Sequence, residues 1–136
     1  MNLSAHNKSK INNGNTYWGD HHNWYWKGLL CHWRINGDPN DPPIVLIHGF
    51  GASSEHWRNN EKDFVDAGFC VYGLDLIGFG KSEQPIRKKV KSLDNRFWAK
   101  QLASFLDQIV LKNKSKKAIL IGNSLGGLVA LTTFTF

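Results

Sequence analysis

The sequence predicts an α/β protein in which an antiparallel hairpin precedes a mostly parallel, doubly wound sheet. Three short apolar runs, 44–47, 69–74 and 118–121, are each followed by a glycine-containing loop and then by a segment with helical character. Continuous apolar and β-branched runs are typical of parallel strands, which are buried on both faces. Alternation of strand and helix is the pattern of a parallel sheet built from right-handed crossovers.

The individual elements follow from periodicity and turn signals. The hairpin is expected over 24–35, and the turn-rich segment 36–43 separates it from the first parallel strand. A helix is expected from Ser53 or Ser54 to Asp66 or Ala67, before a stop at Gly68. Ser92 is expected to cap the clearest helix, whose apolar residues recur at steps of three and four: Phe97, Trp98, Leu102, Phe105, Leu106, Ile109 and Val110.

Length and composition fit a single globular domain. The chain has 136 residues, and its hydrophobic fraction is 41%. Residues 1–20 are expected to be a disordered polar tail, because the N-terminus is rich in Asn and Lys and lacks an apolar signal core. No stretch of the sequence approaches the length of about 20 apolar residues that a membrane span needs, so no membrane span is expected. Cys31 and Cys70 lie in or beside apolar runs without metal or redox spacing, so we expect buried thiols in a reducing, cytoplasmic compartment.

The net charge of +6 raises the question of a nucleic-acid partner. The positive charge is concentrated in 87–91 and 112–117, and neither cluster has interleaved aromatic residues or a known reading motif. Solvated loops are the favoured interpretation, with no nucleic-acid partner.

The histidines, including the adjacent His21 and His22, lack zinc spacing, and a solvated or packing role is favoured for them. Neither a metal nor an organic cofactor is therefore expected.

One motif carries chemistry directly. Gly122-Asn123-Ser124-Leu125-Gly126 lies between the last apolar run and the last helical segment, which is the context of a nucleophile elbow. Such a turn holds the serine in a strained backbone conformation with its Oγ above the sheet. Glycine is expected at 122 and 126 because strand and helix nearly touch there, and Gly127 is expected to extend that clearance.

A second segment fits the requirements of the same reaction. Acyl transfer needs N–H donors aimed at the developing oxyanion. The Leu125 N–H is one candidate, and the Phe50 N–H, in the loop after the first parallel strand, is the other. The remaining residues of these loops are candidates for substrate contact: His48, Gly49, Gly51 and Asn123. The alternative is that residues 48–51 form only a turn.

Three ordered segments resemble the N-terminal half of the α/β-hydrolase superfamily: HGFGASSEHW (48–57), YGLDLIGFGKSEQP (72–85) and GNSLGG (122–127). The likeness covers residues 22–134 and is nearest to cyanobacterial and plastid hydrolases that include pheophytinase-like proteins. Epoxide hydrolases and haloalkane dehalogenases are more distantly similar. The resemblance implies that residues 21–136 form the first half of such a domain, without its cap and C-terminal half.

The resemblance also implies roles for particular residues. Ser124 would be the nucleophile, with the Phe50 and Leu125 amides as the oxyanion hole. Dehalogenases and epoxide hydrolases carry Asp at the elbow, so Ser124 favours hydrolysis of an ester or related acyl bond of an apolar substrate. Hydrolysis of a carbon–carbon bond is an alternative on the same fold. A non-catalytic interaction module is a second alternative.

The residues that would activate the serine are not found where the family has them. In this fold the acid and then the histidine follow the serine, and residues 125–136 contain neither. Asp75 precedes Ser124 and is expected to bond loop amides instead. We therefore expect an incomplete α/β-hydrolase fold with about five of the usual eight strands. It would be inactive alone and open to a complementing C-terminal chain.

Overall fold

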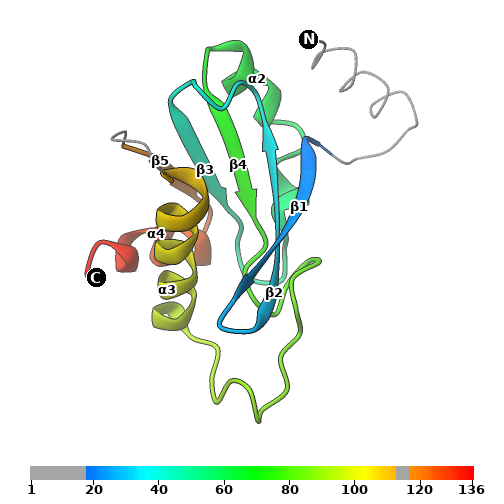
Figure 1. Ribbon diagram of the computed structural model, residues 1–136, viewed down its shortest axis with the longest axis vertical. Helices are drawn as coiled ribbons and strands as arrows, with labels where there is room; N and C mark the ends of the chain where they lie inside the picture. The colour runs from blue at the N-terminus through cyan, green and yellow to red at the C-terminus, as the bar shows by residue number, and fades with distance from the viewer. Residues whose placement is uncertain (1–17, 113–116) are drawn as a thin grey trace.

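Five strands form one mixed sheet in the order β1-β2-β4-β3-β5 (Figure 1). The computed structural model describes residues 18–112 and 117–136. β1 pairs antiparallel with β2, β2 pairs antiparallel with β4, and β4, β3 and β5 run parallel. The strands span Asp20–Trp26 (β1), Leu29–Asn36 (β2), Pro43–Ile47 (β3), Cys70–Leu74 (β4) and Ile119–Gly122 (β5).

Helices cover both faces of this sheet. α3 (Asn95–Phe105) continues into one π-helical turn, η2 (Leu106–Val110), and packs beside α4 (Leu125–Thr133) (Figure 1). The 3₁₀ turn η1 (Ser54–Trp57) and the short α2 (Glu61–Asp66) pack near the other face. The antiparallel hairpin and the doubly wound parallel strands predicted from the sequence are thereby confirmed.

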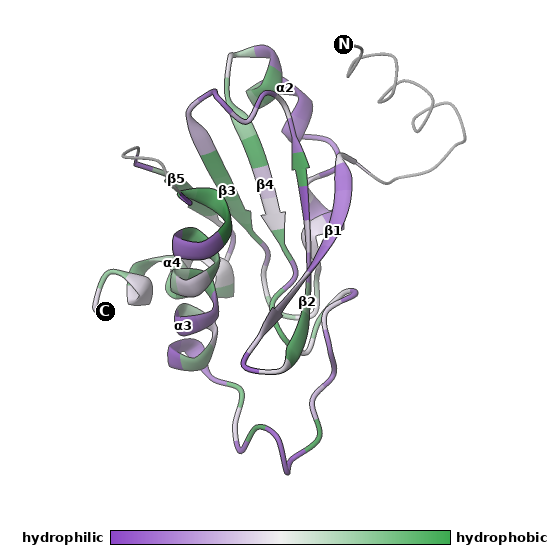
Figure 2. Ribbon diagram, viewed as in Figure 1, coloured by the Kyte–Doolittle hydropathy of each residue, from purple (hydrophilic) through white to green (hydrophobic). Residues whose placement is uncertain are grey.

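The alternation of side chains along β3 explains the two-sided burial. Val45 and Ile47 join the core under α3 and α4, whereas Ile44 and Leu46 join the core on the side of α2. All five residues of β3 are buried, and Figure 2 shows hydrophobic colouring along most of β3 and at the start of β4. This fully apolar pattern is what a parallel strand requires when both of its faces are covered.

Two helix boundaries differ from the sequence prediction. The helix expected from Ser53 or Ser54 to Asp66 or Ala67 is broken into η1 and α2 at residues 58–60, which are exposed. On either side of this break, Trp57 of η1 is buried in the core, and the buried Glu61 at the start of α2 accepts a hydrogen bond from Asn36 Nδ2 at 2.7 Å.

The predicted cap of α3 is also wrong. The helix starts at Asn95, and the residue that caps it is Asp94 rather than Ser92. Asp94 Oδ1 accepts a hydrogen bond from Phe97 N at 2.9 Å, which satisfies one of the free N–H groups of the first turn.

The folded domain begins earlier than the sequence suggests. Trp18, which the sequence places in a tail ending at residue 20, is only 4% exposed and donates from Nε1 to Ser54 O at 2.8 Å. Its ring packs over Gly73, where a Cβ atom would lie 2.6 Å from the indole. The tail prediction for residues 1–17 concerns residues outside the described ranges.

Candidate functional site

Ser124 has an unusual backbone conformation at the junction of β5 and α4. Its φ of 57° and ψ of −116° lie outside the usual regions, and Lys27 is the only other non-glycine residue with positive φ in the described ranges. Its side chain is exposed. The turn is closed by hydrogen bonds from Gly126 N to Asn123 O and from Leu128 N to Ser124 O. This is the conformation that a nucleophile elbow requires.

Close backbone approach explains two of the three elbow glycines. A Cβ atom on Gly122 would collide with the backbone of Gly126, and one on Gly126 would collide with the carbonyl oxygen of Ile47. The sequence predicted that Gly127 also provides clearance between strand and helix, and this is wrong. A Cβ atom at Gly127 would lie 3.5 Å from the nearest atom, which is ordinary contact. Clearance is therefore needed at 122 and 126 but not at 127.

The loop after β3 lies directly against the elbow. Asn123 N donates to Ile47 O at 3.1 Å, and a Cβ on Gly49 would lie 3.5 Å from Ser124 Cβ. The fold thus brings together loop segments that are some 75 residues apart in sequence. Phe50, the next residue, is 77% exposed beside this contact. The roles of the Phe50 and Leu125 N–H groups in binding an oxyanion stay predictions.

His48 lies in this loop, but its side chain points into the protein. It is fully buried, and its Nε2 accepts a hydrogen bond from Leu76 N at 3.0 Å while Nδ1 donates to Gly49 O at 2.7 Å. Burial lowers the pKa of His48, so the neutral ring is favoured. Because both ring nitrogens form hydrogen bonds inside the protein, His48 links the loop after β3 to the loop after β4 and does not line a substrate surface.

Asp75 fastens the loop after β4 in a similar way. Its carboxylate accepts hydrogen bonds from Ser54 N at 2.7 Å and Lys81 N at 2.9 Å, and it contacts His32 Nδ1 at 2.8 Å. Burial raises the pKa of Asp75, but these hydrogen bonds outweigh it and hold the pKa well below its usual value. The predicted bonding of loop amides by Asp75 is confirmed.

Two further residues of this buried network are not evident from the sequence. His32 bridges Asp75 and His21, whose Nδ1 lies 2.8 Å from His32 Nε2. Gln101 accepts from Ile77 N and donates to Asp75 O, so α3 also holds the loop after β4. The polar Gln101 on the apolar face of a helix is the one signal that could have indicated such a role.

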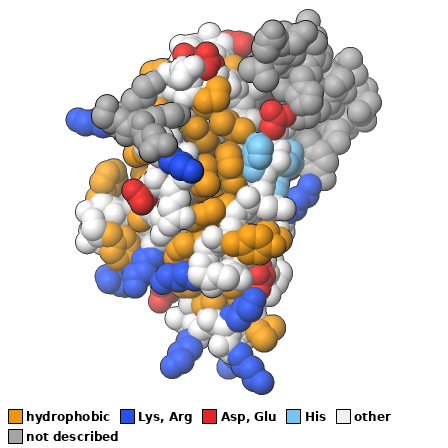
Figure 3. Space-filling model, in the orientation of Figure 1, with side chains coloured by type: hydrophobic (Ala, Val, Ile, Leu, Met, Phe, Trp, Pro, Cys, Tyr) orange, Lys and Arg blue, Asp and Glu red, His pale blue; other side chains and the backbone are white. Residues whose placement is uncertain are grey.

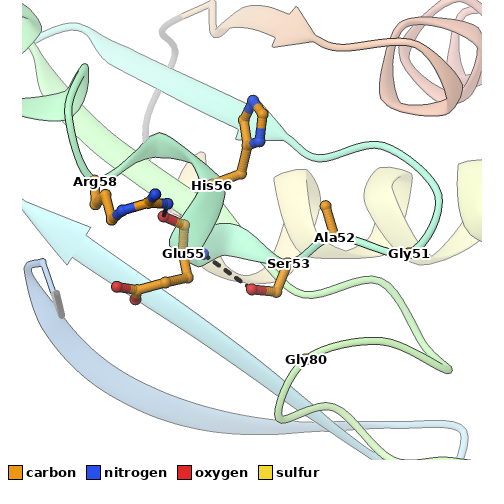
Figure 4. A pocket seen from close by; sticks show the side chains of 7 residues that line it. All are labelled: Gly51, Ala52, Ser53, Glu55, His56, Arg58 and Gly80. Carbon is orange, nitrogen blue, oxygen red and sulfur yellow. Dashed lines mark hydrogen bonds between the residues drawn. The ribbon is translucent and has the colours of Figure 1, made fainter.

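Ser124 has no general base within the described residues. Three of the described histidines are hydrogen-bonded as given above, and His22 stacks on Trp33. His56 lines an open pocket of about 430 Å³, drawn in Figure 4, which adjoins the loop after β3 through Gly51 but does not include Ser124. Within the described ranges, no group of three or more His, Cys, Asp or Glu side chains could hold a metal ion.

Comparison with known proteins agrees with this geometry. Residues 42–134 match the family model described as the alpha/beta hydrolase fold. The chain belongs to the alpha/beta hydrolase family. The crystal structure of Epoxide Hydrolase A from Mycobacterium thermoresistibile superposes with a TM-score of 0.72 at 29% identity, covering 84% of this chain and 34% of that chain.

Two relatives belong to the same alpha/beta hydrolase family. The AB hydrolase superfamily protein YfhM of Bacillus subtilis is 32% identical over 76% of this chain and 34% of its own length. The pimeloyl-[acyl-carrier protein] methyl ester esterase of Vibrio parahaemolyticus is 34% identical over 73% of this chain and 32% of its own length. The chain therefore spans about a third of the length of these relatives. The finer resemblance to pheophytinase-like proteins stays a prediction.

Proposed function

We propose that this chain carries the nucleophile of a serine-type hydrolase that cleaves an ester or related acyl bond of an apolar substrate. The observation that carries the proposal is the exposed Ser124 with its φ of 57° between a strand and a helix. Strain of this kind persists only where surrounding structure enforces it, and it is concentrated at catalytic residues. Serine rather than aspartate at this position supports acyl transfer over epoxide opening.

The reaction would use the two loops that meet at the elbow. Ser124 Oγ attacks the substrate carbonyl, and its proton passes to a general base. The N–H groups of Phe50 and Leu125 stabilise the oxyanion of the tetrahedral intermediate, a contribution of about 3 kcal/mol each. Collapse of the intermediate releases the alcohol, and water then hydrolyses the acyl-enzyme.

Aromatic residues beside the elbow support an apolar substrate. The exposed ring of Phe50 makes a T-shaped contact with the ring of Phe79 at a centroid distance of 5.2 Å, and Phe79 in turn contacts Trp98 at 5.7 Å. An exposed aromatic side chain next to a polar nucleophile suits an acyl group that is removed from water on binding.

Cys31 and Cys70, buried and not joined in a disulfide, support a reducing, cytoplasmic setting.

We further propose that polypeptide other than these 136 residues supplies the base. The family places the acid and the histidine after the serine, and residues 125–136 contain neither. A complementing C-terminal chain that brings both residues to Ser124 would fulfil this requirement. The isolated chain is accordingly expected to be inactive.

A fluorophosphonate probe, which labels activated serines, tests the proposal. The chain alone is expected to remain unlabelled. In a chimera, residues 42–134 would replace the matching segment of the Vibrio parahaemolyticus esterase, which then supplies the remainder of the fold. This chimera is expected to be labelled and to hydrolyse p-nitrophenyl esters, and its Ser124→Ala variant to lose both properties.

Each other outcome has a definite meaning. Labelling that survives Ser124→Ala would rule out Ser124 as the nucleophile. Ser124-dependent labelling of the isolated chain would show that its own residues supply the base. A chimera that melts cooperatively but is never labelled would instead support a non-catalytic interaction module. A labelled chimera that cleaves carbon–carbon bonds and not esters would favour that alternative hydrolysis.

A further inference from the structure

The loop between β4 and α3 presents a cluster of cations at one end of the molecule. Residues 86–93, called the basic loop below, include four exposed cationic side chains: Arg87, Lys88, Lys89 and Lys91. In Figure 1 this loop projects beyond the sheet at the lower end. Figure 3 shows Lys and Arg side chains gathered there with hydrophobic side chains among them.

The basic loop is held in place by the core beneath it. Val90 is half-buried and packs against the core under α3, and its N–H donates to Ile86 O at 3.2 Å. Lys89 pairs with Glu83 at 2.9 Å. Among the described residues, Arg87, Lys88 and Lys91 form no ion pair. Three exposed cations of the loop therefore have no carboxylate within ion-pair distance.

Exposed aliphatic side chains flank these cations. Ile86 is 62% exposed and Leu93 is 38% exposed, one at each end of the basic loop. Cations beside exposed aliphatic side chains are the composition of segments that lie at a bilayer surface, where the charge meets anionic headgroups and the apolar side chains enter the interface.

A neighbouring turn adds to the same end of the molecule. Glu83, just before the basic loop, exchanges hydrogen bonds with Leu30: Leu30 N donates to Glu83 Oε1 and Glu83 N donates to Leu30 O. This contact brings the β1–β2 turn, with the exposed Lys27, close to the start of the loop. Arg96, in the first turn of α3, is exposed just beyond the end of the loop.

We propose that the basic loop docks the protein on the surface of a bilayer that contains anionic lipid. The loop follows β4 on the side of the sheet where the parallel strands end, and Ser124 follows β5 on that same edge. A bilayer bound there would therefore face the edge of the sheet that carries the elbow. This inference does not depend on the chemistry of Ser124.

A lipid surface fits the basic loop better than a nucleic acid does. Single-stranded nucleic acid is bound by aromatic platforms on which bases stack, and residues 86–93 contain no aromatic residue. Phosphate contacts alone would not use the exposed Ile86 and Leu93. A bilayer interface accommodates both the cations and the aliphatic side chains.

Cosedimentation of the 136-residue chain with vesicles tests the proposal. We expect binding to phosphatidylcholine vesicles that contain phosphatidylserine, little binding to pure phosphatidylcholine, and release as salt rises from about 0.1 to about 0.5 M. The double variant Lys88→Glu/Lys91→Glu should weaken binding by about tenfold or more. Ile86→Ser should weaken it by a smaller factor that changes little with salt over the range in which binding is measurable, because it removes apolar contact rather than charge.

The matched control is Lys112→Glu/Lys117→Glu, which changes the net charge by the same amount. These two exposed lysines precede the start of β5, at the edge of the sheet opposite to the one that carries the basic loop and the elbow. This variant should bind nearly as well as the unaltered chain. Equal losses in the two double variants would overturn the proposal, because net charge alone would then explain binding. Equal binding to both kinds of vesicle, or loop-dependent binding to duplex DNA without vesicle binding, would also overturn it. All variants replace exposed side chains, and circular dichroism melting checks that they fold.

Discussion

At the elbow, the distance between backbones determines which residue each position accepts. β5 and α4 are joined by a single tight turn, and Gly126 faces the carbonyl oxygen of Ile47 in the neighbouring strand. Gly127 lies one residue further along the same helix, where a side-chain methyl group meets only ordinary contacts. Two adjacent glycines in one motif therefore have different structural requirements.

Alanine substitution distinguishes these two positions. Gly126→Ala should destabilise the fold by about 2 kcal/mol or more, because the new methyl group forces β3 and α4 apart. Gly127→Ala should be neutral or stabilising by up to about 1 kcal/mol, because alanine favours a helix over glycine. Urea unfolding followed by tryptophan fluorescence measures both. Similar losses in the two variants would contradict the assigned packing.

At the scale of single elements, α3 provides the main support for the loops of the site. Its face buries Trp98, Leu102 and Phe105, and Gln101 on the same face bonds the loop after β4. The start of this helix is determined by one side-chain oxygen, that of Asp94. Loss of that cap exposes an unsatisfied N–H at the end of the helix that adjoins the basic loop.

Comparing two alanine variants tests which residue caps α3. Asp94→Ala should lower the free energy of unfolding by about 1 kcal/mol, the usual cost of losing an N-cap. Ser92→Ala should change it by much less, since Ser92 is exposed and outside the helix. The urea midpoint of each variant gives the comparison. A larger loss in Ser92→Ala would restore the cap that the sequence pattern suggests.

The strands were predictable because their signal is local. The apolar runs of β3, β4 and β5 need no knowledge of their partners, and the elbow glycines lie within one short motif. Helix boundaries were less predictable, because residues at these boundaries make tertiary contacts that no local pattern contains, such as the burial of Trp57 and the hydrogen bond of Glu61 with the distant Asn36.

The buried polar contacts of the site were the least predictable part. His48 bonds an amide 28 residues away, and His32 bonds a carboxylate 43 residues away. Such partners depend on strand order, which no local pattern contains. The sequence placed His48 in the loop after β3 but suggested that it contacts substrate. In the structure, both ring nitrogens of His48 instead form internal hydrogen bonds.

On the scale of the whole molecule, one side of the fold is covered less than the other. β5 is the last strand in the sheet order, and large apolar side chains are exposed on α4 beside it (Leu128 and Leu131) and directly after this helix (Phe134 and Phe136). These four side chains are called the face of α4 below. Among the described residues, no helix reaches the length and apolar character that a membrane crossing requires. Exposed apolar groups beside a strand edge favour association between chains.

Self-association of the 136-residue chain should therefore depend on this face of α4. Leu131 and Phe134 are 69% and 76% exposed, so Leu131→Lys/Phe134→Lys removes apolar contact without opening a cavity. In sedimentation velocity the unaltered chain should form larger species as its concentration rises, and the double variant should remain monomeric. The control Asn23→Lys/Asn59→Lys adds equal charge at exposed polar positions and should still associate. If both variants become monomeric, charge repulsion rather than the face of α4 governs association, because only the first variant alters that face.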